Sequence, residues 1–212
     1  MTPDDDENSS HECAARALPP HMLELRDHDA LALLRKRDER GFDLIYERYA
    51  ERLFGFLVRL SRSRALAEDL LQHTFLRLAE AGPGLRADSD LRAWLFTVAR
   101  NAYHSHARGL GVEARLDRSP WPAETIGTIN GNAGPDSGLA LRELERALAG
   151  LSPPDRELLL LVGVEGLSYA EMAVVLSVDC GTARKRVSRA RARLAQVLDE
   201  QARVVRKSEV KS

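Results

Sequence analysis

The fold is decided by residues 168–193, which read SYAEMAVVLSVDCGTARKRVSRARAR. Ser168 followed three residues later by Glu171 forms the capping box that starts a short helix. A turn over residues 177–181 is predicted to follow, and Thr182 is predicted to open a second, longer helix. This order of helix, short turn and helix is typical of a helix-turn-helix unit, whose second helix enters the major groove of DNA.

The second helix of this unit has two chemically different faces. At 100° per residue, four small or apolar side chains fall within about 40° of one line, namely Ala183, Val187, Ala190 and Leu194. This line is expected to pack on the preceding helix through Met172, Ala173 and Leu176. The opposite side offers donors for phosphates and guanine edges, namely Thr182, Arg184, Lys185, Ser188 and Arg189. The alternative is a generic helical hairpin with a basic outer face, but capping box, turn length and face pattern together favour DNA binding.

Charge is distributed unevenly along the chain. The 212 residues carry 31 Lys and Arg against 32 Asp and Glu, a formal net charge of −1. Residues 1–15 hold five acids and no Lys or Arg, whereas residues 184–193 hold six bases and no acid. A dense basic helix in a nearly neutral chain indicates a local surface for a polyanion.

There is no apolar run of about 18 residues, so direct membrane insertion is not expected. With only Cys13 and Cys180, a disulfide scaffold or multi-cysteine zinc site is excluded, and a reduced cytoplasmic location is the default.

The pattern predicts an all-α chain with two small helical domains joined by a flexible linker. Five segments are expected, namely a disordered tail (1–26), a helical domain (27–108), a linker (109–138), a helix-turn-helix domain (139–201) and a basic tail (202–212). The linker assignment rests on six glycines and three prolines, a composition that does not support a packed domain.

Apolar spacing and capping residues place the individual helices. In the first domain, helices are predicted over 27–37, 42–60, 65–79 and 91–107, with Asp27 and Asp90 as N-caps. In the second domain, a helix over 139–149 is followed by one that starts at Ser152, with Pro153 at its first position, and ends near Gly166.

Two helices of the first domain carry candidate binding residues. On the helix over 65–79, acids and one leucine share an outer face, which suits docking of a basic protein surface, although an ordinary solvated face is an equal alternative. That face consists of Glu68, Asp69, Gln72, His73 and Leu76.

On the helix over 91–107, basic and aromatic residues alternate, as in proteins that hold single-stranded DNA. Those residues are Arg92, Trp94, Arg100, Asn101, His104 and Arg108, of which Trp94 also has the spacing of a core residue. The loop from Gly82 to Asp90 is a candidate element for taking up flipped bases.

Five segments in this order resemble the bacterial RNA polymerase sigma factors of the two-domain, extracytoplasmic-function (ECF) type. They are AEDLLQHTF (67–75), WLFTVARN (94–101), LSPPDRE (151–157), LSYAEMA (167–173) and GTARKRVSRAR (181–191). Departures from the usual pattern lie in the turn, where Ser177 replaces a common Gly and Asp179-Cys180 is unusual, and at Ala183, where Val is commoner.

The resemblance implies a transcription-initiation factor without catalytic residues, metal or cofactor. The Glu68–Arg77 segment would dock on the clamp helices of core RNA polymerase. Residues 91–108 and the loop before them would melt and read the −10 promoter element, and residues 182–193 would read the −35 element as duplex. The linker would thread near the active centre, and an anti-sigma factor, often membrane-bound, would hold the protein inactive. The protein would therefore be cytoplasmic, nucleoid-associated when active, and tethered to the membrane only through that partner.

Two other functions remain as alternatives at this point. A conventional helix-turn-helix repressor or activator would dimerise or sense a ligand through its first domain and would bind a palindromic operator without polymerase. A nucleic-acid enzyme would need clustered carboxylates for metal or an activated nucleophile, and Glu68-Asp69 is the only candidate pair.

Overall fold

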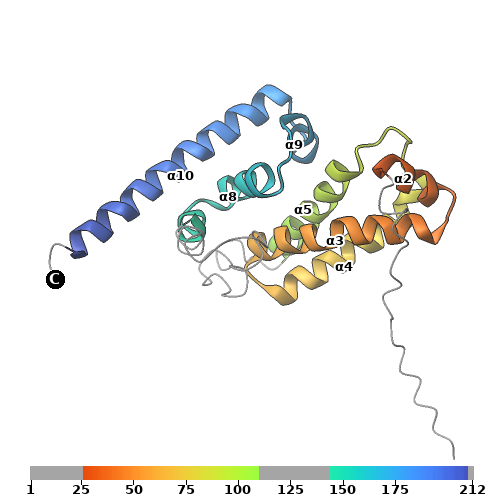
Figure 1. The fold of residues 1–212 in the computed structure, drawn as a ribbon, viewed down its shortest axis with the longest axis horizontal. Coiled ribbons are helices and arrows are strands. Elements are labelled where there is room, and N and C mark those ends of the chain that lie inside the picture. Colours follow the sequence, from red (N-terminus) through yellow and green to blue (C-terminus); the bar gives the residue numbers. More distant parts are fainter. Residues whose placement is uncertain (1–25, 110–143, 210–212) are drawn as a thin grey trace, which may run out of the picture.

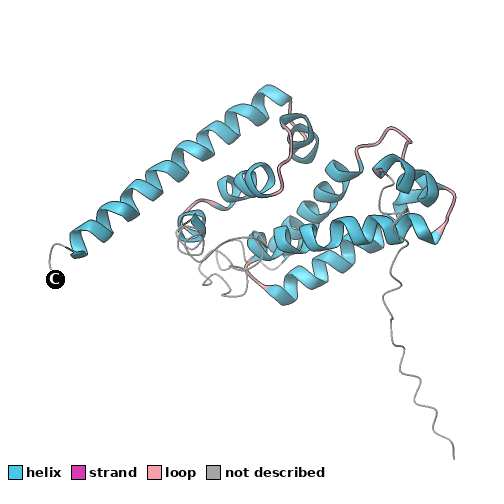
Figure 2. Ribbon diagram, viewed as in Figure 1, coloured by secondary structure: helices cyan, strands magenta, loops and turns pink. Residues whose placement is uncertain are grey.

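The computed structural model describes residues 26–109 and 144–209, and all regular elements within these two ranges are helical (Figures 1 and 2). The N-terminal domain contains α2 (Asp27–Arg35), α3 (Glu39–Ser61), α4 (Arg64–Ala81), the short η1 (Gly82–Gly84) and α5 (Leu91–Gly109). The C-terminal domain contains a helical stretch at 144–149, then α8 (Pro153–Leu159), η3 (Leu160–Val164), α9 (Tyr169–Leu176) and α10 (Cys180–Glu209). The expected all-α, two-domain fold with a C-terminal helix-turn-helix is confirmed. The tail at 1–25 and nearly all of the 109–138 linker lie outside the described residues.

The long helices of the N-terminal domain begin and end where short polar side chains satisfy their terminal backbone groups. Asp38 accepts from the Arg40 N–H at 3.0 Å to start α3, and the Ser63 hydroxyl accepts from the Leu66 N–H at 3.3 Å to start α4. Asp90 accepts from the Ala93 N–H at 2.9 Å, which confirms it as the cap of α5. These caps add one to three residues to the starts expected for α3 and α4 and leave that of α5 unchanged.

Asp27 is not the N-cap that the sequence predicted. The cap position is Arg26, and Asp27 is the first residue of α2. The Asp27 carboxylate instead accepts from the Tyr49 hydroxyl and pairs with Arg48 at 2.5 Å, both on α3. The carboxylate is therefore used to fasten α2 against α3, and burial together with this hydrogen bond raises the pKa of Tyr49.

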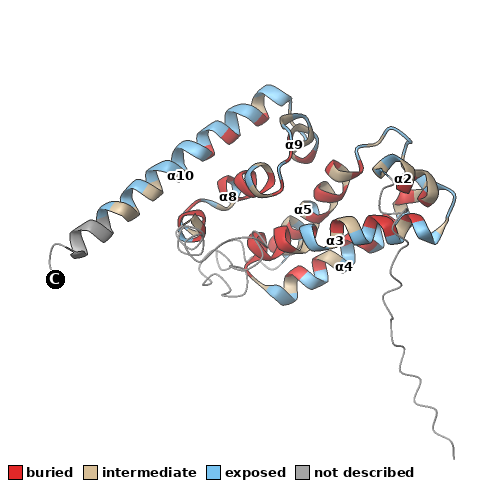
Figure 3. Ribbon diagram, viewed as in Figure 1, coloured by how far each residue is buried: buried red, intermediate tan, exposed pale blue. Residues whose placement is uncertain are grey.

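The core of the N-terminal domain lies between α3, α4 and α5 (Figure 3). Phe56 of α3 and Phe96 of α5 are fully buried and meet edge to face, with ring centroids 5.4 Å apart. Leu53, Leu78 and Leu95 fill the space around them and are also fully buried. This packing fixes the orientation of α4 and α5. The faces of these two helices that point away from the core carry the candidate binding residues.

In the C-terminal domain a wide helical turn follows α8. Ser152 caps α8 as predicted, accepting from the Asp155 N–H at 3.4 Å. After Leu159 the backbone widens into the π-helical turn η3, where the Glu165 N–H donates to the Leu160 carbonyl. Gly166 ends the turn with a φ of +66°, a conformation that favours glycine. The sequence predicted the stop at Gly166 but not the π-helical turn, which directs Glu165 toward the N-terminal domain.

Candidate nucleic-acid interfaces

The helix-turn-helix packs as the face pattern predicted. Ala183, Val187 and Ala190 of α10 have no exposed surface, and Met172 of α9 is equally buried. Lys185, Ser188 and Arg189 are exposed on the other side of α10, and Arg184 lies over the Tyr169 ring at 5.3 Å. Small side chains on the buried face allow close approach of the two helices, and the basic face is left free for a ligand. The helix runs beyond the expected end at Gln201, to Glu209.

The turn of this unit is shorter than the expected 177–181. Cys180 and Gly181 belong to the first turn of α10, so the connection consists of Ser177, Val178 and Asp179. Ser177 adopts the left-handed conformation, with φ 52° and ψ 48°, which explains in physical terms why glycine is common at this position. Asp179 caps α10 by accepting from the Thr182 N–H at 2.8 Å and from the Thr182 hydroxyl at 2.6 Å. The Thr182 hydroxyl thus donates its proton to the cap and keeps its lone pairs as acceptors.

Asp179→Ala is expected to fray the first turn of α10. The hydrogen bonds from Thr182 hold the pKa of Asp179 below its ordinary value, so the ionised carboxylate is the form that stabilises the cap. A group with a lowered pKa loses its contribution as pH falls, so wild type should fray in the same way on acidification. Amide hydrogen exchange at Thr182 measures both effects. Unchanged protection of this amide in the Asp179→Ala protein would exclude the capping role.

The candidate residues on α5 separate onto different faces. Arg92, Arg100 and His104 point toward the C-terminal domain, where each contacts a glutamate or a carbonyl. Trp94 is half-buried and packs against the core, and Arg108 is exposed. Asn101 lines a groove of about 480 Å³ between α4 and α5, together with Asp69 and His73. The structure therefore brings three of the six residues together and places Asn101 beside the docking candidates.

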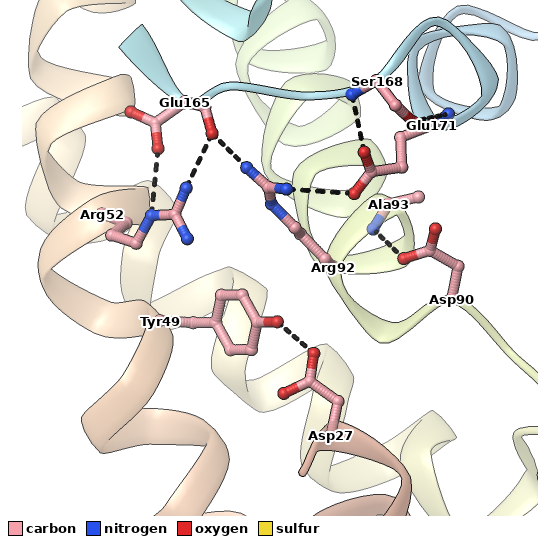
Figure 4. A network of polar contacts seen from close by, with 9 residues as sticks. All are labelled: Asp27, Tyr49, Arg52, Asp90, Arg92, Ala93, Glu165, Ser168 and Glu171. Carbon is pink, nitrogen blue, oxygen red and sulfur yellow. Dashed lines mark hydrogen bonds and ion pairs between the residues drawn. The ribbon is translucent and has the colours of Figure 1, made fainter.

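Arg92 and Arg52 bind the same segment of the C-terminal domain (Figure 4). Both guanidinium groups donate to the Glu165 carbonyl, Arg52 at 2.7 Å, and Arg92 also pairs with the Glu171 carboxylate at 3.2 Å. The Glu165 carboxylate lies 3.5 Å from Arg52. Burial raises the pKa of the Glu165 carboxyl, against the opposing influence of the surrounding arginines. Sequence reasoning missed Arg52 and Glu165, because nothing local in the chain marks two residues 113 positions apart as partners.

Two further glutamates complete this contact. Glu157 receives Arg100 and His104 together, with the His104 Nε2 at 3.0 Å. Glu171 acts twice, because its carboxylate accepts from the Ser168 N–H at 2.6 Å in the predicted capping box and also meets Arg92. Burial opposes ionisation of Glu171, but the hydrogen bonds from Ser168 and the nearby Arg92 outweigh it and lower the pKa of this carboxyl.

The five docking candidates form one exposed strip on α4. This docking ridge consists of Glu68, Asp69, Gln72, His73 and Leu76, all exposed, with Leu76 64% accessible. Beside it, Tyr46 of α3 is 47% exposed and lies on Phe75, with ring centroids 4.7 Å apart. Tyr46 was not predicted as a surface residue, and its helix neighbours Phe42, Ile45 and Tyr49 gave no signal of exposure. Leu76 of α4 and Tyr46 of α3 are thus large apolar side chains that stay exposed in this domain.

No group of three or more His, Cys, Asp or Glu side chains that could hold a metal ion occurs within 26–109 and 144–209. Over the same residues, no helix combines the length and the apolar character needed to cross a bilayer.

Comparison with known proteins identifies the class. The model of Sigma-70 region 2 matches residues 45–111, and that of Sigma-70 region 4 matches residues 141–194. The chain is 35% identical over 164 residues to the RNA polymerase sigma factor CarQ of Myxococcus xanthus, covering 76% of this chain and 90% of the relative. It is 35% identical over 163 residues to the ECF sigma factor SigC of Mycobacterium tuberculosis, covering 76% and 86%.

Solved structures agree in fold. The sigma factor RpoE of Bartonella quintana, in complex with the anti-sigma factor NepR, matches with a TM-score of 0.59 and 30% identity over 76% of this chain and 98% of that one. CnrH, in complex with the cytosolic domain of CnrY, shares the fold with a TM-score of 0.63 at 22% identity, over 82% and 97%. The chain belongs to the RNA polymerase sigma factors that contain Sigma-70 regions 2 and 4. Within that family it is an ECF sigma factor, which directs promoter-specific transcription initiation by RNA polymerase.

Proposed function

We propose that three surfaces of this sigma factor divide the work of initiation. The docking ridge binds the clamp helices of core polymerase, as a mixed acidic and apolar strip suits a basic partner. The −10 element, as a single strand, is taken by α5 through Arg92, Trp94, Arg100, Asn101, His104 and Arg108. The −35 element, as duplex, is taken by α10 through Thr182, Arg184, Lys185, Ser188 and Arg189. The domains correspond to 27–108 and 139–201, with the linker at 109–138 between them.

The observation that carries this proposal is the division of α10 into a buried apolar face and an exposed face rich in basic residues. Lys185, Ser188 and Arg189 are exposed within about the first three turns of the helix, and the buried residues opposite them hold the helix on α9. Side chains in the first turns of a recognition helix reach base edges, whereas flanking arginines reach phosphates. The protein itself performs no chemistry and needs no cofactor in this role.

Arg189→Ala and Lys185→Ala are expected to weaken promoter binding by the reconstituted holoenzyme. A lost contact to a base edge costs about 1–3 kcal/mol and relaxes preference at one position of the −35 element. Competition binding on −35 variants measures this. An equal loss on all sequences would reassign the residue to phosphate contact, and no loss would remove it from the interface. Arg203→Ala is the matched control, because Arg203 is exposed farther along the same helix.

Regulation by an anti-sigma protein is a second part of the proposal. The Bartonella quintana relative was solved with the anti-sigma factor NepR, and this chain covers 98% of that relative. We infer that a comparable partner binds this chain in the cytoplasm and keeps it from the polymerase, and that the released protein joins the nucleoid. Adding that partner to the reconstituted holoenzyme is expected to suppress transcription from its promoters.

A further inference from the structure

The two domains meet through a strongly complementary polar contact. On the N-terminal side the contact is cationic, and its members on α3 and α5 are Arg52, Arg59, Arg92, Arg100 and His104. On the C-terminal side the contact is acidic, and its members are Glu157, Glu165 and Glu171. Helices α5 and α9 pack side by side across it. Cations otherwise suited to phosphates are thus held by carboxylates of the same chain.

This contact removes charged groups from water. The side chains of Glu157 and Glu165 are each 4% exposed, and acids are buried to this extent almost only when paired. Arg59 is 3% exposed, and its guanidinium fits because the neighbouring residue one turn before it is Gly55, where a Cβ would lie 2.9 Å from the Arg59 Nη1. Burial lowers the pKa of Arg59, although Glu165 and Glu145 oppose this.

The contact is not fully satisfied. Among the described residues, the Nε atoms of Arg59 and Arg92 are buried and have no hydrogen-bond partner. A buried donor without a partner destabilises the state that buries it. Two donors on the cationic side of the contact are thus left without an acceptor even with three glutamates opposite them.

We propose that Glu157, Glu165 and Glu171 take the places of −10 DNA phosphates, so that the C-terminal domain closes over the strand-reading face of α5 in the free protein. This inference deepens the proposed function and rests on its assignment of Arg92, Arg100 and His104 to the −10 element. Carboxylates and phosphates accept from arginine in the same geometry, so the two compete directly. The docking ridge lies outside the contact and is exposed, so polymerase can bind the closed chain.

The closed state lowers the apparent affinity for DNA in proportion to its population. When about nine molecules in ten are closed, the apparent Kd is about tenfold weaker than that of the open chain, because only the open fraction binds. Closure thus adds a physical reason for weak DNA binding by the free protein.

Energy transfer between dyes on the full chain tests the closed state directly. One dye is attached to the native Cys180, which is exposed, and the other to Ala87→Cys in the exposed loop before α5. Cys13→Ser removes the second native cysteine, so that only these two sites are labelled. Glu157→Gln is nearly isosteric and removes the charge that holds Arg100 and His104. It is expected to shift the population to lower transfer efficiency, and Arg52→Ala, which acts from the other domain at a more exposed site, is expected to do the same. Glu200→Gln, on an exposed part of α10, makes the same charge change and should leave the transfer unchanged.

Binding of a fluorescent single-stranded oligothymidine measures competition in the same proteins. Glu157→Gln is expected to raise the affinity about three- to tenfold and Glu200→Gln to leave it unchanged. Circular dichroism confirms that each variant keeps its helix content. Transfer that stays high in both Glu157→Gln and Arg52→Ala would overturn the closed state, and opening without a gain in DNA affinity would overturn the competition.

A further variant separates this inference from the proposed function. Arg100→Ala added to Glu157→Gln is expected to abolish the gain in DNA affinity while the chain stays open. An open chain whose gain in affinity survives Arg100→Ala would place the strand elsewhere. That result would contradict both the assignment of Arg100 to the −10 element and the competition at Arg100, whereas the transfer measurement alone would still establish closure.

Discussion

Asp69→Lys combined with Leu76→Lys is expected to lower the affinity for core RNA polymerase about a hundredfold or more. Leu76 is 64% exposed without a folding role, the kind of side chain that becomes an anchor once a partner covers it. Asp69 lies on the same face of α4 and supplies the charge that a basic partner meets. Each replacement removes an attractive contact and adds a repelling charge, and two losses of more than about 1.4 kcal/mol together give this effect.

The measurement is equilibrium binding of labelled sigma factor to purified core polymerase. The matched control is Ala195→Lys combined with Asp199→Lys, which makes the same change in net charge at two exposed positions of α10. Both double variants should unfold like wild type, because exposed substitutions change stability little. Binding that is unaffected by the substitutions on α4 would show that the docking ridge is an ordinary solvated face.

Arg156→Ala is expected to destabilise the C-terminal domain by about 3–5 kcal/mol. Arg156 is 2% exposed, and its guanidinium donates to the carbonyls of Leu148, Ala149 and Leu151 at 3.0–3.2 Å. Two of these carbonyls belong to the helical stretch at 144–149, and the third directly precedes Ser152, the cap of α8. The guanidinium therefore joins the two segments. Removing the guanidinium leaves buried acceptors without donors, and water cannot reach them without opening the domain.

Urea unfolding followed by circular dichroism checks this expectation. Arg146→Ala provides the control, since Arg146 is exposed on the 144–149 helix and its loss should change stability by less than about 0.5 kcal/mol. If both variants unfold at the same urea concentration, the buried guanidinium does not hold this corner of the domain.

Local chemistry predicted the elements whose determinants lie within one helix turn. The Ser168–Glu171 capping box and the Ser152 cap formed as expected, because each side chain satisfies a backbone group three residues away. The buried line on α10 was equally predictable, since one helical period decides which side chains face α9. The departure at Ser177 also has a local explanation, in its left-handed backbone.

Features that depend on distant partners were not predictable in this way. The Asp27 carboxylate binds Tyr49 and Arg48 on the next helix, and the N-cap position of α2 is therefore occupied by Arg26. The π-helical turn η3 was missed because no residue preference marks it. The sequence marked Arg92 and Arg100 on α5 as candidate DNA contacts, but periodicity could not show that glutamates more than fifty residues away hold them.

In the proposed division of roles, separate surfaces of one small chain meet separate partners. The docking ridge is free for polymerase, the basic face of α10 is free for duplex, and the cations of α5 are covered by the glutamates of the C-terminal domain. Affinity for the promoter then comes from two modest contacts made together on the polymerase, because tethering makes the second contact effectively intramolecular. The chain alone is expected to bind promoter DNA poorly.

In vitro transcription from a promoter library with purified core polymerase tests the central claim most directly. The account predicts that adding wild-type protein starts transcription from a defined subset of promoters sharing −10 and −35 sequences, and that the Asp69→Lys and Leu76→Lys protein starts none. Tight, sequence-specific promoter binding by the protein alone, with no transcription when polymerase is added, would contradict it.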